Sequence, residues 1–245
     1  MMMYKAGMKD FWGTNELPDE PFFGIKQTHF KTQEYNGGTI VALACNGFAI
    51  IAGDARLNRD KANYIHNHNQ NKIFQLAGNC ILGSAGCWTD VLTFTSLVEN
   101  YTARFRRNHA DMLSLGDIAK MLSFFMYPRR PSPYCITNLV AGLNEKGEGI
   151  VYSLGNQIYC QKWAYKATGS AGASVQKILD SRIGLTSLEL DVPWEISEER
   201  AMDIITDAFT SVPERDTILG DSVTINTITE TGITVSLLKL REDIY

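Results

Sequence analysis

The stretch at residues 36–54, NGGTIVALACNGFAIIAGD, decides the fold of this chain. It holds two apolar runs of strand length, at 40–44 and 48–52, joined by an Asn-Gly pair at 46–47. Because both residues of such a pair readily take positive φ angles, the pattern is the strongest short-range signal for a β-hairpin. Thr39 stands at the mouth of this hairpin, directly after two glycines, as a candidate hydroxyl nucleophile.

The composition limits the kind of protein. The 245 residues are 44% hydrophobic and 20% charged, which suits one large domain with a full core. The net charge of −4 is mild, so we expect neither a nucleic-acid partner nor a membrane surface. No apolar run approaches the roughly 20 residues that span a bilayer. The five cysteines form no CxxC pair, which is typical of reduced, buried thiols in an intracellular protein.

The predicted elements beyond the hairpin follow a simple order. A polar, Asn-rich segment at 57–71 is predicted to be a loop. Apolar residues later recur every three or four positions in two helices, one behind Thr89 as N-cap and one between Ser114 and Pro128. The remaining predictions are strands at 72–76, 80–84, 135–142, 150–154, 158–160, 163–167, 223–229 and 234–240, and helices at 173–182, closing at Gly184, and from Ser197 as N-cap.

Tight turns join neighbouring strands in this order, so the sheets are expected to be mainly antiparallel. The helices come in two separate pairs, each between blocks of strands. This arrangement favours an α+β fold in which two sheets pack face to face and a helical pair covers each outer face. The sequence therefore predicts a four-layer αββα sandwich.

Several short motifs stand on this framework, and together they resemble the β-type subunits of the 20S proteasome. The resemblance covers about residues 36–241 and is strongest for the non-catalytic subunit at the sixth position of the β ring. It implies the N-terminal nucleophile hydrolase fold, with residues 1–36 as an arm or pro-segment and 37–245 as the β-type domain. The motifs are Asn36-Gly37-Gly38-Thr39-Ile40, Phe48-Ala49-Ile50, Gly53-Asp54-Ala55-Arg56, Arg129-Arg130, Pro133-Tyr134, 142–147, Val151-Tyr152-Ser153, Glu214-Arg215-Asp216 and Gly220-Asp221.

The resemblance also implies a role. A non-catalytic β subunit completes the β ring and helps to wall the chamber used for ATP/ubiquitin-dependent protein degradation. Its partners would be the other α- and β-type subunits, in a 28-subunit stack of four seven-membered rings, with unfolded polypeptide inside the chamber. The expected location is the cytoplasm and nucleus, and no cofactor is implied.

Catalytic members of this family use a free N-terminal Thr, whose hydroxyl attacks the peptide carbonyl while its own α-amine accepts the proton. Counting back from Asp54 by the family spacing puts Gly38 at this position, and glycine has no hydroxyl. Leu219 stands where catalytic members usually have a Ser. We therefore predict no catalytic residue. The resemblance carries over only a vestigial pocket, made of Asp54, Arg56, Lys72, the oxyanion-hole residue Gly86, Ser170 and Asp216.

Two alternatives compete with this interpretation. The first is an active threonine peptidase, in which cleavage after Gly38 would expose Thr39. Thr39 stands one residue closer to Asp54 than the family spacing requires, and in a strand a one-residue slip turns a side chain to the opposite face. The second alternative is a stand-alone antiparallel sandwich that acts as a binding module.

Three further side chains offer other chemistry. His66 and His68 lie in the Asn-rich loop, with no Cys or carboxylate at ligand spacing, so we expect no metal site there. Cys87 follows a Gly-rich turn. A reactive thiol at Cys87 is the alternative to the commoner buried, inert cysteine.

Overall fold

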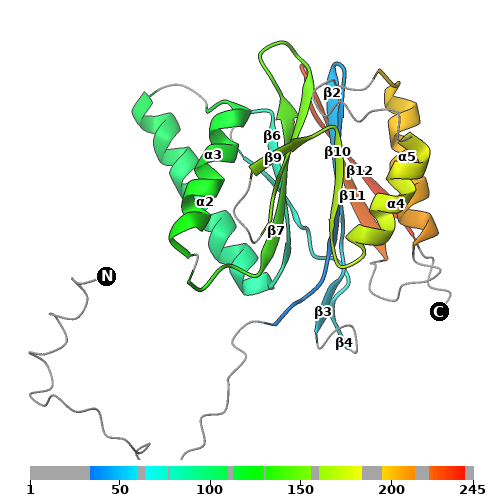
Figure 1. Ribbon diagram of the computed structural model, residues 1–245, viewed down its shortest axis with the longest axis horizontal. Coiled ribbons are helices and arrows are strands. Elements are labelled where there is room, and N and C mark those ends of the chain that lie inside the picture. The colour runs from blue at the N-terminus through cyan, green and yellow to red at the C-terminus, as the bar shows by residue number, and fades with distance from the viewer. Residues whose placement is uncertain are drawn as a thin grey trace, which may run out of the picture. The chain divides into compact units, whose positions relative to one another are not determined.

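Two β-sheets packed face to face form the centre of the structure, and a pair of helices covers the outer face of each sheet (Figure 1). The computed structural model describes residues 34–59, 64–76, 78–109, 113–129, 131–155, 160–183, 195–212 and 221–240. The helices are α2 (Trp88–His109) and α3 (Leu115–Met126) on one side, and α4 (Gly172–Ile183) and α5 (Glu198–Ser211) on the other. The predicted αββα sandwich is confirmed.

The first sheet carries the opening hairpin at its centre and has the order β10–β1–β2–β11–β12. All neighbouring strands in it are antiparallel. Gly47 in the predicted turn has a φ of 85°, the left-handed conformation that glycine adopts freely. The strands are β1 (Thr39–Cys45), β2 (Phe48–Asp54), β10 (Tyr165–Gly169), β11 (Ser222–Thr229) and β12 (Gly232–Lys239).

The second sheet has the order β5–β6–β7–β8–β9, again with antiparallel neighbours throughout. Each strand pairs with the next one along the chain. The predicted turn at 144–149 joins β7 to β8, whereas α2 and α3 lie between β6 and β7 in the sequence. The strands are β5 (Ile73–Gln75), β6 (Cys80–Gly86), β7 (Ile136–Leu143), β8 (Gly149–Leu154) and β9 (Cys160–Trp163).

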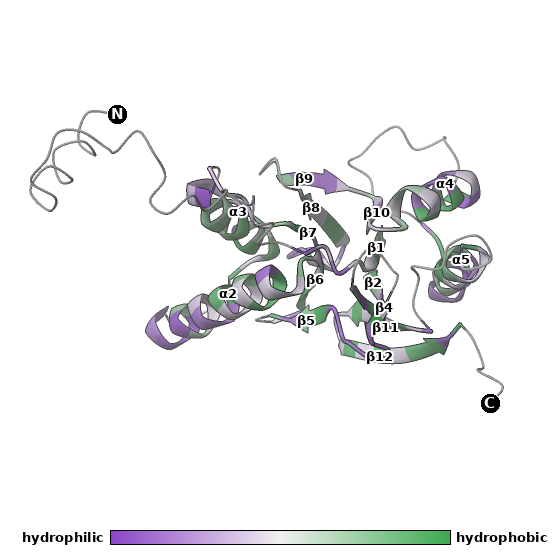
Figure 2. Ribbon diagram, turned by 90° about the horizontal axis from the view of Figure 1, so that it is seen from below, coloured by the Kyte–Doolittle hydropathy of each residue, from purple (hydrophilic) through white to green (hydrophobic). Residues whose placement is uncertain are grey.

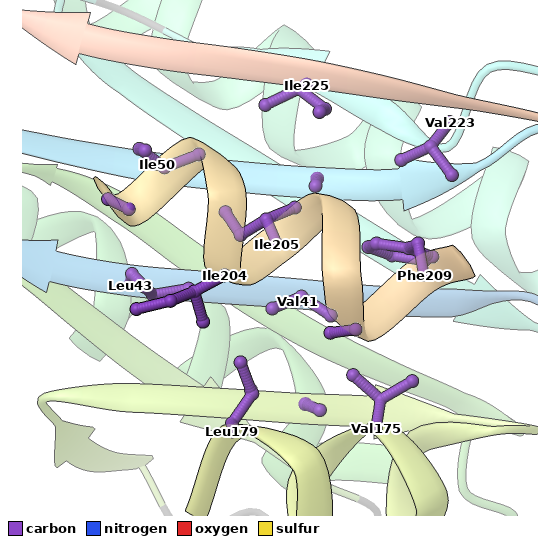
Figure 3. Packing of buried hydrophobic residues seen from close by; sticks show 14 of the residues in the cluster. Val41, Leu43, Ile50, Val175, Leu179, Ile204, Ile205, Phe209, Val223 and Ile225 are labelled. Carbon is purple, nitrogen blue, oxygen red and sulfur yellow. The ribbon is translucent and has the colours of Figure 1, made fainter. Parts of the chain in front are cut away.

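Strand β1 is buried on both faces, because one face meets the second sheet and the other meets the helices. Val41 and Leu43 belong to the cluster beneath α4 and α5, which we call the α4–α5 core, whereas Ile40 and Ala42 belong to the cluster between the sheets. Figure 3 shows side chains of α5, including Ile205, lying over strands β1 and β2. Burial on both faces explains why this hairpin is almost continuously apolar instead of alternating.

The helices show the amphipathic pattern that the sequence predicted, with apolar residues toward the sheets (Figure 2). Ser114 caps α3, since its side chain accepts a hydrogen bond from the Asp117 amide at 3.2 Å. Ser197 caps α5 in the same way through the Arg200 amide. Helix α3 ends before Pro128, which lies in the short 3-10 helix η2 (Tyr127–Arg129). These helix boundaries are confirmed.

The prediction of a loop at 57–71 was wrong for 57–59 and 64–67, is confirmed for 68–71, and falls outside the described residues at 60–63. Strands β3 (Leu57–Arg59) and β4 (Tyr64–Asn67) pair as a separate two-stranded sheet. Leu57 is buried, and Tyr64 and Ile65 have good strand propensity. These residues explain why two short strands form after β2 in a segment of polar composition.

The predicted N-cap of α2 was also wrong, since this helix begins at Trp88 and includes Thr89. The cap is a side chain from far away in the sequence, because the Asn36 carboxamide oxygen accepts a hydrogen bond from the Trp88 amide at 2.7 Å. A local search for Ser, Thr or Asn cannot find such a partner. Strand β9 begins at Cys160, while the predicted strand residues 158–159 and the helix end at Gly184 lie outside the described residues.

The five cysteines are free, and only Cys135 and Cys160 reach the surface of the described structure. Among the helices that the structure describes, none has the length and apolarity needed to cross a bilayer.

Candidate functional site

The predicted pocket lies where β1 begins beside the end of β2. Ile40 pairs with Gly53, so Thr39 lies next to Asp54, and the Thr39 amide donates a hydrogen bond to Asp54 Oδ1 at 2.6 Å. Lys72, just before β5, joins them through a 3.1 Å contact between its Nζ and the same Asp54 oxygen. The fold therefore brings together residues that are far apart in the sequence.

Lys72 and Asp54 form a buried ion pair whose side chains are both 0% exposed. The ammonium group also donates to the backbone carbonyls of Asp54, at 3.0 Å, and of Arg56. Burial lowers the pKa of Lys72, although the neighbouring Asp54 carboxylate opposes that shift. The Asp54 carboxylate and the two carbonyls together accept three hydrogen bonds from the ammonium group and hold it in one position.

Asp54 Oδ2 is buried and has no hydrogen-bond partner among the described residues. Buried carboxylate oxygens are nearly always hydrogen-bonded in folded proteins, because leaving one unpaired costs free energy. Removing Lys72 would leave the whole Asp54 carboxylate buried without a counter-ion, so the ion pair is the main compensation for this buried charge.

Gly38 lies directly against this ion pair. A Cβ atom added at Gly38 would lie 2.7 Å from Lys72 Cε and 3.1 Å from the Ala85 side chain. A side chain at this position would therefore point at Lys72, where a nucleophile has its activating charge. The φ of Gly38 is 103°, which other residues rarely adopt, so the continuous chain requires glycine here.

The Thr39 hydroxyl lies on the other face of β1. It accepts a hydrogen bond from the Ala171 amide at 3.0 Å and lies 3.4 Å from the Ser170 hydroxyl. Thr39 contacts Asp54 only through its backbone amide, and no contact joins its hydroxyl to Lys72 among the described residues. Neither Ala171 nor Ser170 supplies a general base, and in the continuous chain the Thr39 nitrogen is a peptide amide that cannot accept the hydroxyl proton.

Gly86, the predicted oxyanion-hole residue, is already engaged by the protein's own backbone. Its amide donates to the Gly37 carbonyl at 3.2 Å, and its carbonyl accepts from the Asn36 amide at 3.0 Å. An oxyanion hole needs a free backbone N–H aimed at the reacting oxygen. The chain before Gly38 therefore occupies the donor that a substrate carbonyl would need.

Asn36 fixes this segment more firmly than its place in the predicted arm suggests. Besides capping α2 at Trp88, its side chain donates to the Asn58 carbonyl at 3.0 Å, and its own carbonyl accepts from the Asn58 amide. The sequence analysis missed this role. The one available signal was the absence of a good N-cap residue at Cys87, which indicates a cap from elsewhere.

Ser170 supports the chain at Gly38. Its amide and its hydroxyl both approach the Gly38 carbonyl, at 2.9 and 3.3 Å. Asp216 and Leu219, the other predicted positions near the site, lie outside the described residues.

Arg56 contributes its backbone to the pocket and its side chain to a different contact. The guanidinium forms an ion pair with Asp221, which also lies 2.5 Å from His68 Nδ1. The sequence analysis named Asp221 only as part of the Gly220-Asp221 motif. Its contacts with Arg56 and His68 could not be predicted, because these residues lie far away in the sequence. Among the residues that the structure describes, no group of three or more His, Cys, Asp and Glu is placed to hold a metal ion.

The comparison with known proteins now decides the family. The sequence profile of proteasome subunits matches residues 34–228. The chain belongs to the proteasome subunit family. It is 40% identical to proteasome subunit beta type-1 of Drosophila melanogaster over 233 residues, 94% of this chain and 98% of that protein. It is 35% identical to proteasome subunit beta type-1-B of Carassius auratus, over 93% and 95% of the two chains. It is 34% identical to beta type-1 of Danio rerio, over 95% and 98%.

Proposed function

We propose that this chain is a non-catalytic β subunit of the 20S proteasome core and occupies the beta type-1 position. Its similarity to three beta type-1 proteins over nearly their whole length supports this assignment. The proposal that the subunit is non-catalytic rests on Gly38. The position whose side chain would point at Lys72 has no side chain at all.

A second contact supports the same conclusion. With the Gly37 carbonyl bound to the Gly86 amide, the chain itself fills the oxyanion position. A peptide substrate would have to displace this contact before its carbonyl could be polarised there. The pocket therefore lacks both the attacking oxygen and a free oxyanion donor.

The proposed role is structural. The subunit would complete the β ring beside other β-type subunits, contact the α ring, and help to wall the chamber in which unfolded polypeptide is degraded by neighbouring subunits. We propose the same partners as the resemblance implies, in four stacked seven-membered rings, and a location in the cytoplasm and nucleus. No cofactor takes part in this role.

The rival function is an active threonine peptidase that uses Thr39. It would require cleavage between Gly38 and Thr39, and a rotation that takes the Thr39 hydroxyl from the Ala171 amide to the side of Lys72. A free binding module is the other rival, and it would require the chain to exist outside any ring.

The deciding experiment purifies an epitope-tagged copy of this chain from native extract, treats it with a Thr-directed covalent inhibitor, and measures its particle mass and N-terminal sequence. We expect co-elution with a large particle, labelling of other subunits, and an unlabelled tagged chain that begins at Gly37 or earlier. Elution as a free chain of 27.3 kDa would contradict ring membership. A labelled chain that begins at Thr39 would establish the peptidase.

A matched pair of variants tests the pocket itself. In Gly38→Thr the new Cβ would crowd Lys72 at 2.7 Å, so we expect no threonine-type turnover from this subunit in the assembled particle. Thr39→Val removes the hydroxyl that the rival peptidase would use and should leave the particle's activity unchanged. Turnover gained by Gly38→Thr would show that the remaining pocket is competent, and activity lost with Thr39→Val would support the rival peptidase.

A further inference from the structure

Cys87 and Cys135 lie directly opposite each other where β6 ends and β7 begins. Gly86 pairs with Ile136 in the register of these antiparallel strands, so the next opposed pair is Cys87 and Cys135. The Cys87 amide donates to the Cys135 carbonyl at 2.8 Å, which extends the ladder by one residue. We propose that these two thiols form a dithiol site that peroxide closes to an intramolecular disulfide.

The strand geometry suits such a bridge. Directly opposed residues on antiparallel strands point to the same face of the sheet, with Cα atoms about 4.5–5.5 Å apart. One backbone hydrogen bond joins Cys87 to Cys135, while the Cys135 amide donates to the Asp90 carboxylate at 2.9 Å. Disulfides typically join Cα atoms about 4.4–6.8 Å apart. Closing the bridge requires the Cys87 sulfur to leave the Thr89 hydroxyl, 3.6 Å away, and turn toward Cys135.

No other cysteine has this arrangement in the described sheets. Cys45 opposes Phe48, Cys80 opposes Gly142, and Cys160 opposes Leu154. Cys45 is also buried, which raises its pKa to about 12 and leaves it almost entirely protonated at neutral pH. The register thus singles out Cys87 and Cys135.

Access decides the order of events. Cys135 is partly exposed, whereas Cys87 is only 2% exposed, so peroxide reaches Cys135 first. Burial raises the pKa of Cys135, and the nearby Cys87 sulfur and Asp90 carboxylate raise it further. Because the thiolate is the nucleophile, the reaction is slow at neutral pH and becomes faster as the pH rises.

The chemistry takes two steps. The Cys135 thiolate attacks one oxygen of hydrogen peroxide, which breaks the O–O bond, gives a sulfenic acid and releases hydroxide. The Cys87 sulfur then attacks the Cys135 sulfur, the S–O bond breaks, and the thiol proton leaves with the hydroxyl group as water. In total, two thiols lose two electrons and two protons, and one peroxide becomes two waters.

The bridge would lie beside the pocket. Gly86 directly precedes Cys87, and a Cβ at Gly86 would be 2.2 Å from the Cys135 carbonyl oxygen, so the two strands are already in close contact here. The disulfide would tie the end of β6 to the start of β7 next to the Gly86–Gly37 contact. This inference stands whether or not the subunit is catalytic.

The test exposes the native assembled complex to hydrogen peroxide, blocks the remaining thiols, and maps tryptic peptides of this chain without reduction. We expect a peptide pair that has lost two hydrogens, disappears on reduction, and forms faster at higher pH. Fragment spectra must distinguish Cys87 from Cys80, which lies on the same tryptic peptide. The pair should be retained in Cys160→Ser, which removes an exposed thiol, and lost in Cys135→Ser.

Two results would overturn the proposal. One is a sulfinic acid on Cys135 with Cys87 still open to alkylation, and the other is a Cys135 bridge to a different chain. If Cys135→Ser fails to assemble, the wild-type peptide map alone decides, since it identifies both sulfurs. The same peroxide dose on the unfolded chain is the control, and mixed cysteine pairs there would show that the fold selects Cys87 and Cys135.

Discussion

The α4–α5 core and the Asp54–Lys72 pocket both involve strands of the first sheet, but different interactions stabilise them. The core is built from aliphatic and aromatic side chains of β1, β2, β11 and two helices, and it depends on apolar area removed from water. The pocket holds two opposite charges with 0% exposure and one carboxylate oxygen without a partner. Stability of the core therefore scales with the apolar volume that fills it, whereas stability of the pocket depends on the pairing of a few charged atoms.

This difference teaches what each region is for. A protein that needs only stability does well with apolar residues in place of a buried ion pair, since charges lose their hydration on folding. Asp54 and Lys72 lie beneath Gly38, a position with no side chain, and each depends on the other as its buried counter-ion. Four changes test the contrast, in order of decreasing effect.

The largest effect is expected for Lys72→Met. This change leaves the Asp54 carboxylate buried without its counter-ion, so we expect a loss of about 3–5 kcal/mol in the free energy of unfolding. Urea unfolding of the purified chain, followed by tryptophan fluorescence, measures it. The double variant Asp54→Asn with Lys72→Met removes both charges and should lose clearly less. Equal losses in the two variants would mean that the ion pair itself is unimportant.

A cavity in the α4–α5 core comes next. Ile205 is fully buried on α5, so Ile205→Ala should lower the free energy of unfolding by about 2–5 kcal/mol through lost burial and the empty space left behind. Ile205→Val at the same site should lose only about 0.5–1.5 kcal/mol. A larger loss for Ile205→Ala than for Ile205→Val would confirm that buried apolar area determines the stability of this core. An equal loss in both variants would contradict it.

Gly38→Ala should have an intermediate effect. The added Cβ would meet Lys72 Cε at 2.7 Å, and alanine at a φ of 103° is strained, so we expect a loss of about 1–3 kcal/mol. Gly47→Ala is the matched control, since its φ is also positive but nothing lies within 4 Å of a Cβ there. The excess loss at Gly38 over Gly47 measures crowding of the pocket in thermal unfolding.

The smallest effect is expected at Asp221. Burial acts to raise its pKa, but hydrogen bonds from His68 and Arg56 outweigh burial and hold that pKa below its usual value. Because the pKa is lowered on folding, the stabilisation is complete above the unfolded-state pKa of 3.8 and disappears as the pH falls through the folded-state value.

Asp221→Asn should therefore lower the free energy of unfolding by less than about 1 kcal/mol at neutral pH, because this pair is partly exposed. The difference from wild type should vanish in strong acid, which unfolding curves at a series of pH values would show. A difference that persists below the folded-state pKa would assign the effect to packing and not to charge.

The extent to which the fold could be predicted depended on the range of each signal. The Asn-Gly hairpin, the Ser114 and Ser197 caps and the stop at Pro128 all rest on neighbours within a few residues, and the structure confirms them. The start of α2 was mispredicted because its cap, Asn36, lies 52 residues away in the sequence. The β3–β4 pair was missed because its polar composition hid a strand signal.

For the candidate site, the resemblance implied Asp54 and Lys72, counting back from Asp54 by the family spacing selected Gly38, and the structure brings these three together. The sequence could not show that the Gly86 amide donates to the Gly37 carbonyl, or that the Arg56 side chain pairs with Asp221. Such contacts depend on how separate strands pack, and no spacing within one strand encodes them.

By itself, then, the sequence determined the four-layer architecture, because turn chemistry and strand period are local properties, and its resemblance to the family marked Gly38 as the position without a hydroxyl. Only the tertiary structure decided which face Thr39 presents, which backbone group fills the oxyanion position, and which two cysteines oppose each other. Each of these depends on the register between strands that meet through long-range pairing, and that register is set when the whole core packs.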